Sequence, residues 1–305
     1  MSNAAAKVFE ALEEFQNATL DAELVDNVRN LARQQTVYQS GVLEKEEYVK
    51  SPLLQLLIDN RITFASSPGL AHVLYAPSSS GKTCALRYFV ETILKDAGAP
   101  ALMISGNGHN VNYLDYMATV LRIREGTQGR SEAQWIASLV AGLSPQSNMP
   151  AVRHAPVLVL DEFNLPGEND QNINFADSFA RFIYARSFTV IFVTQDLAMA
   201  KELCKLNQWQ KIGPLPGLSQ PERWSLKKGE LPPANYNWNG MQWTTERLTT
   251  MIMQRKRFKN KFNEQVKDGV LEWLEEVSTP TAAIAAASEQ LALALPEYEI
   301  SSDLK

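Results

Sequence analysis

The chain has 305 residues, of which 45% are hydrophobic and 21% charged, a balance typical of a soluble globular protein with one α/β core and helical additions. Its net charge of −5 provides no general attraction to nucleic acid or to an anionic membrane. Two cysteines, Cys84 and Cys204, are too few for a disulfide framework or a zinc site. We expect both to be buried thiols in a reducing compartment.

Residues 1–50 are expected to form an N-terminal helical arm. Apolar residues recur at helical spacing between residues 5 and 35, which predicts two amphipathic helices packed on the core, with partner binding as the alternative. The first residues contain neither a basic leader nor a long apolar stretch. The sequence therefore predicts an intracellular protein, cytoplasmic or nuclear, that is not secreted and has no membrane segment.

The most informative motif follows the apolar run 70–75 and reads Ala76, Pro77, Ser78, Ser79, Ser80, Gly81, Lys82 and Thr83. A β-type run, a Ser/Gly turn and a helical stretch starting near Cys84 are typical, in this order, of a phosphate-binding loop. We expect residues 76–84 to bind ATP. In such a loop Lys82 reaches the β and γ phosphates, and Thr83 ligates Mg²⁺.

Two positions depart from the usual pattern of such loops. Ala76 replaces the first glycine, and Ser79 stands where many of these loops carry another glycine. Ser79 must therefore either avoid positive φ or accept mild strain. The alternative interpretation is that Gly-Lys-Thr only caps a helix by chance.

A second motif lies in residues 156–162. Four aliphatic residues, typical of a strand buried on both faces, end in Asp161 and Glu162. Ligands of open α/β sheets bind at the carboxyl edge of the strands. We therefore expect Asp161 to hold Mg²⁺ and Glu162 to polarise the water that attacks the γ-phosphate; an ordinary strand end is the alternative.

With these two motifs, residues 51–215 resemble the core of P-loop ATPases that carry an additional catalytic glutamate, the division of AAA+, STAND-type and RecA-like ATPases. RecA-like recombinases have a similar Ser-Ser-Gly-Lys-Thr loop. The resemblance implies a three-layer α/β/α core with a parallel sheet of order 5-1-4-3-2. Its five strands would be, in order, residues 70–75, 101–105, 157–160, 188–193 and 211–216.

The resemblance also implies a polar "sensor 1" side chain after the fourth strand. Thr194 and Gln195 are the candidates for this catalytic role. The alternative is that they cap the helix that begins near Leu197.

Residues 216–305 are expected to comprise an irregular loop and a helical lid. The segment 213–243 is rich in Pro, Gly, Asn and Trp, whose aromatic rings either anchor the loop or stack on a base or a partner. Helical periodicity over 244–277 resembles the lid of AAA+ and STAND ATPases, with Arg247 or Arg255 as a "sensor 2" arginine. The alanine-rich run 281–295 is too short to span a bilayer and predicts a docked or oligomer-forming helix.

Two basic features raise partner hypotheses. The run 255–261 either grips a nucleic-acid backbone or forms a solvated helix face. Arg181 and Arg186 lie on an expected helix over 174–186, where AAA+ rings often carry residues that face the neighbouring nucleotide. The alternatives are therefore a homo-oligomer with an arginine supplied in trans and two solvated residues at a helix end.

The sequence as a whole predicts a Mg²⁺-dependent ATPase that acts as a molecular switch or motor, with an unidentified protein partner. The alternative is a slowly hydrolysing, ATP-gated scaffold that assembles on DNA or a protein, and a third possibility is a non-hydrolysing regulator. Asp-x-x-Gly after the third strand and Asn-Lys-x-Asp are both missing, which disfavours a Ras-type GTPase. The scarcity of arginines between Gly213 and Thr245 disfavours a small-molecule kinase with an Arg-rich lid.

Overall fold

A computed structural model describes the following residues: 13–14, 17–34, 36–37, 48–59, 70–75, 78–106, 112–124, 126, 129–143, 156–164, 172–176, 178, 189–205, 243–258 and 260–294. The chain divides into two compact units. The sheet unit comprises Met1–Gln39, Ile58–Ala76 and Phe89–Tyr236. The C-terminal unit comprises Ser40–Leu57, Pro77–Tyr88 and Asn237–Lys305.

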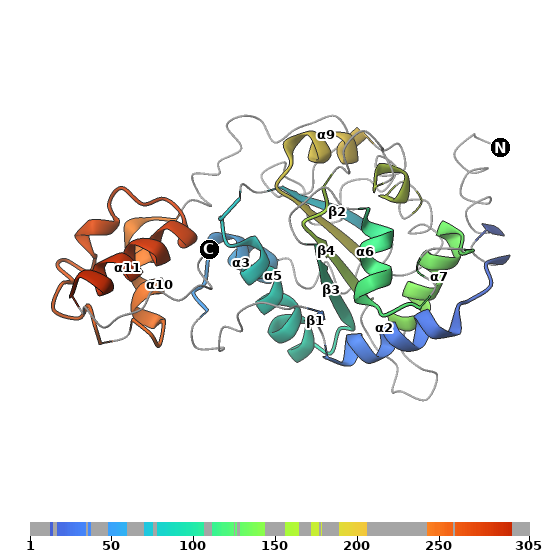
Figure 1. Cartoon of the computed structure of the whole chain (residues 1–305), viewed down its shortest axis with the longest axis horizontal. Helices are drawn as coiled ribbons and strands as arrows, with labels where there is room; N and C mark the ends of the chain where they lie inside the picture. The colour runs from blue at the N-terminus through green and yellow to red at the C-terminus, as the bar shows by residue number, and fades with distance from the viewer. Residues whose placement is uncertain are drawn as a thin grey trace. The chain divides into compact units, whose positions relative to one another are not determined.

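The sheet unit is an α/β fold (Figure 1). Its strands are β1 (Thr36–Val37), β2 (Leu70–Tyr75), β3 (Ala101–Ser105), β4 (Val157–Asp161) and β5 (Thr189–Thr194). Its helices include α2 (Ala22–Gln34), the π-helix η2 (Phe89–Leu94), α6 (Tyr113–Val120), α7 (Glu132–Leu143) and α9 (Leu197–Lys205). Helix α3 (Pro52–Asp59) begins in the C-terminal unit and ends in the sheet unit.

All strand pairs of the sheet are parallel, in the order β1-β3-β4-β5-β2. Counted from the first predicted strand, β2, the order of the four core strands is 1-4-3-2, which confirms this part of the predicted topology. The short strand β1 was not anticipated, and it extends the sheet beside β3. The expected fifth strand, residues 211–216, lies outside the described residues.

Strands β3, β4 and β5 are buried on both faces. The apolar even-numbered residues of β3, β4 and β5 form one core with helices α2, α6, α7 and α9. The odd-numbered residues of these strands are buried as well. Strands of this kind read as continuous aliphatic runs, which explains why the sequence located them within one residue at either end.

The register of the parallel strands sets which residues meet at the carboxyl edge of the sheet. Ser105 ends β3 opposite Asp161, the last residue of β4. Tyr75, which precedes the phosphate-loop motif in the chain, ends β2 opposite Thr194 of β5. The chain therefore leaves β2 at the edge where Asp161 ends β4 and Glu162 follows it.

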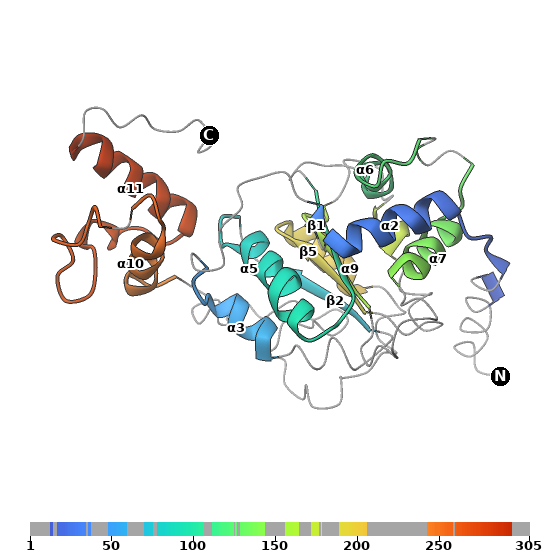
Figure 2. The ribbon, with the colours of Figure 1, turned by 90° about the horizontal axis from the view of Figure 1, so that it is seen from below.

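Helix α2 packs on α7, as expected for the N-terminal region, and Figures 1 and 2 show the two helices side by side. Leu24 and Val28 of α2 are buried in the core of the sheet unit. A Cβ atom on Gly142 of α7 would lie 2.6 Å from Val28 Cβ, so only glycine permits this close approach. Most of the first expected helix lies outside the described residues.

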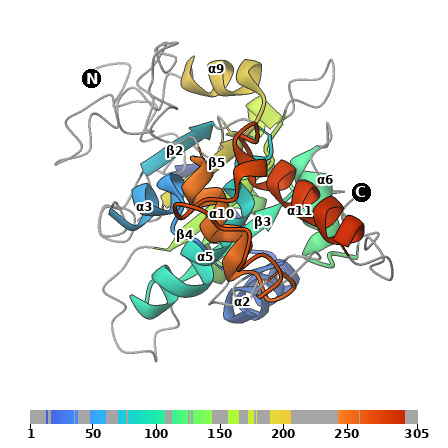
Figure 3. The same ribbon diagram turned by 90° about the vertical axis from the view of Figure 1, so that its left-hand side faces the viewer.

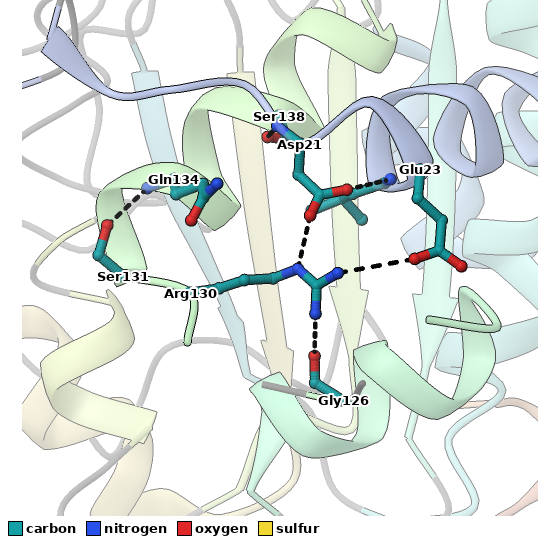
Figure 4. Close-up of polar contacts among 8 residues, drawn as sticks. Asp21, Glu23, Gly126, Arg130, Ser131, Gln134 and Ser138 are labelled. Carbon is teal, nitrogen blue, oxygen red and sulfur yellow. Dashed lines mark hydrogen bonds and ion pairs between the residues drawn. The ribbon is translucent and has the colours of Figure 1, made fainter. Parts of the chain in front are cut away.

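A polar cluster fixes the start of α2 (Figure 4). Arg130 Nε donates to Asp21 Oδ2 at 2.6 Å, and its guanidinium lies 3.6 Å from the Glu23 carboxylate. Asp21 caps the helix by accepting the Leu24 N–H at 2.8 Å, and its own N–H donates to Ser138 Oγ on α7 at 2.9 Å. Burial acts to raise the pKa of Asp21, but the Leu24 N–H and the Arg130 guanidinium outweigh it and lower this pKa.

The C-terminal unit contains α5 (Lys82–Tyr88), α10 (Thr245–Gln254), the 3₁₀ turn η4 (Glu272–Leu274) and α11 (Pro280–Ala294). Helices α10 and α11 contact each other (Figure 3). They share a hydrophobic core that includes Phe258 and Phe262 between them. In the described part of the chain, no helix combines the length and apolar character needed to cross a membrane.

The helical periodicity over 244–277 corresponds to a helix only in its first part, because α10 ends at Gln254. Arg255 has extended backbone angles, and Asn260, Asp268 and Gly269 have φ of 70°, 49° and 83°, which an α-helix does not accept. The apolar residues that suggested a helix are buried instead in an irregular segment against α10 and α11. The alanine-rich helix prediction is confirmed by α11.

Candidate functional site

The loop motif has an unusual backbone. Ser79 has φ 61° and Gly81 has φ 84°, whereas Ser80 between them is not among the described residues with positive φ. Successive residues of alternating φ sign turn their N–H groups toward one side and form an anion-binding concavity. Ser79 thus adopts the mildly strained conformation that the sequence left as one of two alternatives, while Ala76 and Pro77 lie outside the described residues.

Helix α5 begins directly after this loop, with Lys82 as its first residue, and the Ala85 N–H donates to the Gly81 carbonyl at 3.0 Å. The helical path then continues through η2. Lys82 is buried, with only 7% of its surface exposed, and Thr83 is half-buried. A lysine is rarely buried without a functional or structural partner, so the burial of Lys82 points to such a role at the start of this helix.

Cys84 is exposed, which contradicts the expectation that both cysteines are buried. The buried positions of the helix, Lys82, Ala85 and Leu86, continue into Phe89 and Val90 at helical spacing. Cys84 falls on the opposite face of the helix for this reason. The side chain of Cys204 is outside the described residues.

Trp243, at the end of the Pro- and Trp-rich segment, contacts the loop within the C-terminal unit. Its indole Nε1 donates to the Ser80 carbonyl at 3.1 Å. A Cβ atom on Gly81 would lie 3.6 Å from the Trp243 ring and 3.7 Å from Pro280. The sequence offered anchoring as one role for these aromatic residues but did not identify Trp243, which belongs to no motif.

Asp161 is completely buried at the end of β4, in the sheet unit. Its Oδ1 accepts the N–H of Glu162 at 3.0 Å, and its Oδ2 accepts the hydroxyl of Ser105 at 3.4 Å. The Gly106 N–H donates to the Asp161 carbonyl at 3.0 Å. The carboxylate is therefore oriented by groups from two neighbouring strands.

Glu162 has a left-handed backbone conformation, with φ 55°. A Cβ atom on Gly106 would lie 3.2 Å from the Glu162 carbonyl oxygen and 3.4 Å from its Cβ. Gly106 therefore allows the bend after β4. A non-glycine residue held in this region costs free energy, and such strain gathers at functional sites.

The candidate sensor residues differ in their surroundings. Thr194 is completely buried; its hydroxyl donates to Asn164 Oδ1 at 2.9 Å and accepts the Asp196 N–H at 2.9 Å. Gln195 is half-buried. The helix cap is Asp196, whose Oδ1 accepts the Ala198 N–H at 2.8 Å. Neither Thr194 nor Gln195 caps α9 directly, although Thr194 holds the capping residue.

Further polar residues, which the sequence did not identify, lie around Asn164 and Asp161. Asn172 donates to the Asn164 carbonyl and accepts the Tyr113 N–H at 2.9 Å. Tyr113 is completely buried, and its hydroxyl makes no hydrogen bond to another described residue. Burial raises the pKa of Tyr113 well above its ordinary value, and the negative charge of Asp161 raises this pKa further. In the sequence, the one sign of such a cluster was that Ser105 and Gly106 come at the end of a neighbouring strand.

The candidate arginines are only partly described. Arg181 and Arg186, with most of the expected helix 174–186, lie outside the described residues. Arg247 is in the first turn of α10 and exposed, and Arg255 is the C-cap residue that follows this helix. In the basic run, the Arg257 guanidinium lies 4.5 Å from the centre of the Phe258 ring.

The structure places the candidate residues in two groups. Asp161, Glu162, Thr194 and Gln195 belong to the sheet unit, and the loop from Ser78 to Cys84 belongs to the C-terminal unit. Among the described side chains, no group of three or more His, Cys, Asp or Glu gathers as a metal site. Mg²⁺ commonly takes only one or two protein ligands beside phosphates and water, so a larger cluster of protein ligands is not required for this ion.

Comparison of the sequence with models of known protein families finds no match. Comparison with curated proteins finds no significantly similar sequence. The function must therefore be argued from the residues themselves.

Proposed function

We propose that the chain is a Mg²⁺-dependent ATPase of the P-loop type with an additional catalytic glutamate. The observation that carries this proposal is the backbone of the loop from Ser79 to Gly81, whose alternating φ signs suit an anion. The parallel strand order and the carboxylates that follow β4 support it independently. The expected three-layer core with strand order 5-1-4-3-2 is part of this proposal.

The loop would bind the phosphate chain of ATP. N–H groups of residues 79–81 and the start of α5 supply donors, and the ammonium group of Lys82 supplies the positive charge that the β and γ phosphates need. The buried hydroxyl of Ser80, which has no hydrogen-bond partner among the described residues, is a further polar group in the same loop. Nothing in this set is specific for adenine, so the preference for ATP over GTP rests on the missing GTPase motifs.

Thr83 and Asp161 would hold Mg²⁺, which, when bound, neutralises charge on the phosphates. The hydrogen bonds from Ser105 and the Glu162 N–H keep the Asp161 carboxylate in one orientation. Glu162 would orient and polarise the attacking water. Its strained backbone favours this role over that of an ordinary strand end, because strain of this kind is retained where function requires it.

ATP hydrolysis would serve a molecular switch or motor, in which α10 and α11 form the helical part that responds to the nucleotide. A homo-oligomer with Arg181 or Arg186 acting in trans and nucleic-acid binding through residues 255–261 remain hypotheses from the sequence. The slowly hydrolysing ATP-gated scaffold is the competing function, with DNA or a protein as partner.

ATP turnover in the presence of Mg²⁺, measured with and without DNA, tests the proposal. Sustained turnover that Glu162→Gln abolishes supports an ATPase. ATP binding without turnover in either condition supports the scaffold. Failure of the wild-type chain to bind ATP contradicts both functions.

A further inference from the structure

The contact between Trp243 and the phosphate-loop motif joins residues 163 positions apart in the sequence. The indole N–H donates to the main-chain carbonyl of Ser80 at 3.1 Å. The ring also lies beside Gly81, because a Cβ atom on this glycine would be 3.6 Å from it. A main-chain acceptor within the loop is therefore fixed by a side chain from outside it.

This bond fixes the orientation of one peptide group. The C=O of Ser80 and the N–H of Gly81 belong to the same peptide plane, and in a trans peptide they point in opposite directions. The described residues contain no cis peptide bond. Because the Ser80 carbonyl is directed at the indole, the Gly81 N–H is directed away from it.

The conformation of the loop also depends on the backbone of Gly81. At φ 84° it adopts a conformation that permits the alternation with Ser79. Glycine is the most flexible residue, and without an external restraint its peptide can rotate between several conformations. The hydrogen bond from Trp243 opposes this rotation.

We propose that Trp243 is a positioning residue for ATP binding, which holds the Ser80–Gly81 peptide so that the Gly81 N–H donates to the phosphate chain. The inference rests on the proposed function, because it assigns a donor to that same site. Trp243 immediately precedes Thr244, the N-cap of α10, so the same contact connects the nucleotide loop to the start of this helix.

Trp243→Phe tests the proposal, because phenylalanine keeps an aromatic ring against Gly81 and removes the N–H donor. Trp273→Phe is the matched control in the same unit. Trp273 packs on Phe262, with ring centres 5.3 Å apart, but its buried indole nitrogen has no hydrogen-bond partner among the described residues. Affinity for a slowly hydrolysed ATP analogue with Mg²⁺ is measured by calorimetry, and circular dichroism checks the fold.

We expect Trp243→Phe to weaken binding of the analogue by about 5- to 50-fold, since the hydrogen bond from the Gly81 N–H to the charged phosphate chain is lost or poorly aligned. Trp273→Phe is expected to change affinity less than about twofold. Equal affinities of both variants and the wild-type chain would overturn the role of Trp243. Trp243→His, which retains a ring N–H, is expected to bind more tightly than Trp243→Phe, a rescue that a purely structural role does not predict.

A second measurement uses the wild-type chain and does not depend on the folding of a variant. The six tryptophans give six indole N–H resonances in a ¹⁵N correlation spectrum. The analogue is expected to shift one of them in the wild-type chain and none in Lys82→Ala. Binding of the analogue with all six resonances unchanged would contradict the proposal.

The same measurements distinguish the proposed function from the positioning role of Trp243. If the wild-type chain does not bind the analogue, or if Lys82→Ala binds it equally well, the proposed function is wrong. If Lys82→Ala loses binding while Trp243→Phe and Trp273→Phe behave alike, only the positioning role of Trp243 is wrong.

Discussion

The hydroxyl of Thr194 donates to Asn164 Oδ1 at 2.9 Å, which joins the end of β5 to the residues that follow β4. The same hydroxyl accepts the N–H of Asp196. Because its proton is used in the bond to Asn164, Thr194 is committed to structure in this conformation. Of the two sensor candidates, we therefore propose Gln195 for the contact with the γ-phosphate.

A pair of variants separates these roles. Thr194→Val keeps the shape of the side chain and leaves two polar groups without their partner, so we expect the free energy of unfolding to fall by about 2 to 4 kcal/mol. Gln195→Ala is expected to change it by less than about 0.5 kcal/mol and to lower ATP turnover at least about tenfold. Urea denaturation and a turnover assay check both values. Normal turnover in Gln195→Ala would exclude it as the sensor.

The charge and the backbone strain of Glu162 can be tested separately. Glu162→Gln keeps a non-glycine residue at the strained φ and removes the carboxylate, so ATP should still bind while turnover falls by about two orders of magnitude or more. Glu162→Gly is expected to lose turnover to the same extent but to unfold with a free energy equal to or about 1 kcal/mol above that of the wild-type chain, because φ 55° costs glycine little. Turnover that survives in either variant would make Glu162 an ordinary strand-end residue.

The phosphate loop should respond specifically to substitution at Gly81. Gly81→Ala and Gly98→Ala both place a Cβ atom at positive φ, 84° and 68°, and neither meets a steric clash. We expect each to lower the free energy of unfolding by about 1 to 2 kcal/mol. Only Gly81→Ala should weaken ATP binding, which calorimetry measures; equal effects of both variants on affinity would argue against an anion site in this loop.

The ion pair between Asp21 and Arg130 predicts a pH dependence. The pKa of Asp21 is lowered in the folded chain, so its contribution to stability is present above its unfolded pKa and is lost as the pH falls through the folded pKa. Asp21→Asn keeps an oxygen that can cap α2 but removes the charge, at an expected cost of about 1 to 2 kcal/mol at pH 7. Measured by urea denaturation, this difference should shrink below about pH 4. A difference that stays constant down to pH 2 would contradict the assigned role.

The sequence predicted the strands well, because a strand buried on both faces is a continuous aliphatic run in the sequence. Residues 70–75 and 101–105 form strands with the predicted bounds, and β4 and β5 differ from the prediction by a residue at their ends. The two carboxylates were predicted at the right edge for the same reason. The chain order of a parallel sheet then leaves few arrangements.

The polar network around these carboxylates was not predictable in the same way. Asn164, Asn172 and Tyr113 come from separate segments, and no periodicity links them. Gly106 is required by its close approach to Glu162, a property of the folded backbone. Such residues are recognised only when tertiary contacts are known.

In the segment between α10 and α11, tertiary packing overrides helical periodicity. Phe258, Phe262 and Val266 lie four residues apart, which suits a helix, yet the positive φ of Asn260 breaks a helix there and the three residues pack on the core that α10 and α11 share. Trp243 was not identified because no pattern distinguishes it from the other tryptophans of the Pro- and Trp-rich segment. Its hydrogen bond to Ser80 spans 163 positions, and nothing local in the sequence indicates it.

The central claim is that the loop before α5 binds the phosphates of ATP, and a calorimetric titration of Lys82→Ala tests it most directly. Lys82→Ala removes the buried ammonium group from the start of the helix, whereas Lys95→Ala removes an exposed one at the end of the same helical path and serves as the matched control. We predict that the wild-type chain and Lys95→Ala bind Mg²⁺ and a slowly hydrolysed ATP analogue with equal affinity, and that Lys82→Ala shows no detectable binding. Unchanged affinity in a folded Lys82→Ala, or no binding by the wild-type chain, would contradict the claim.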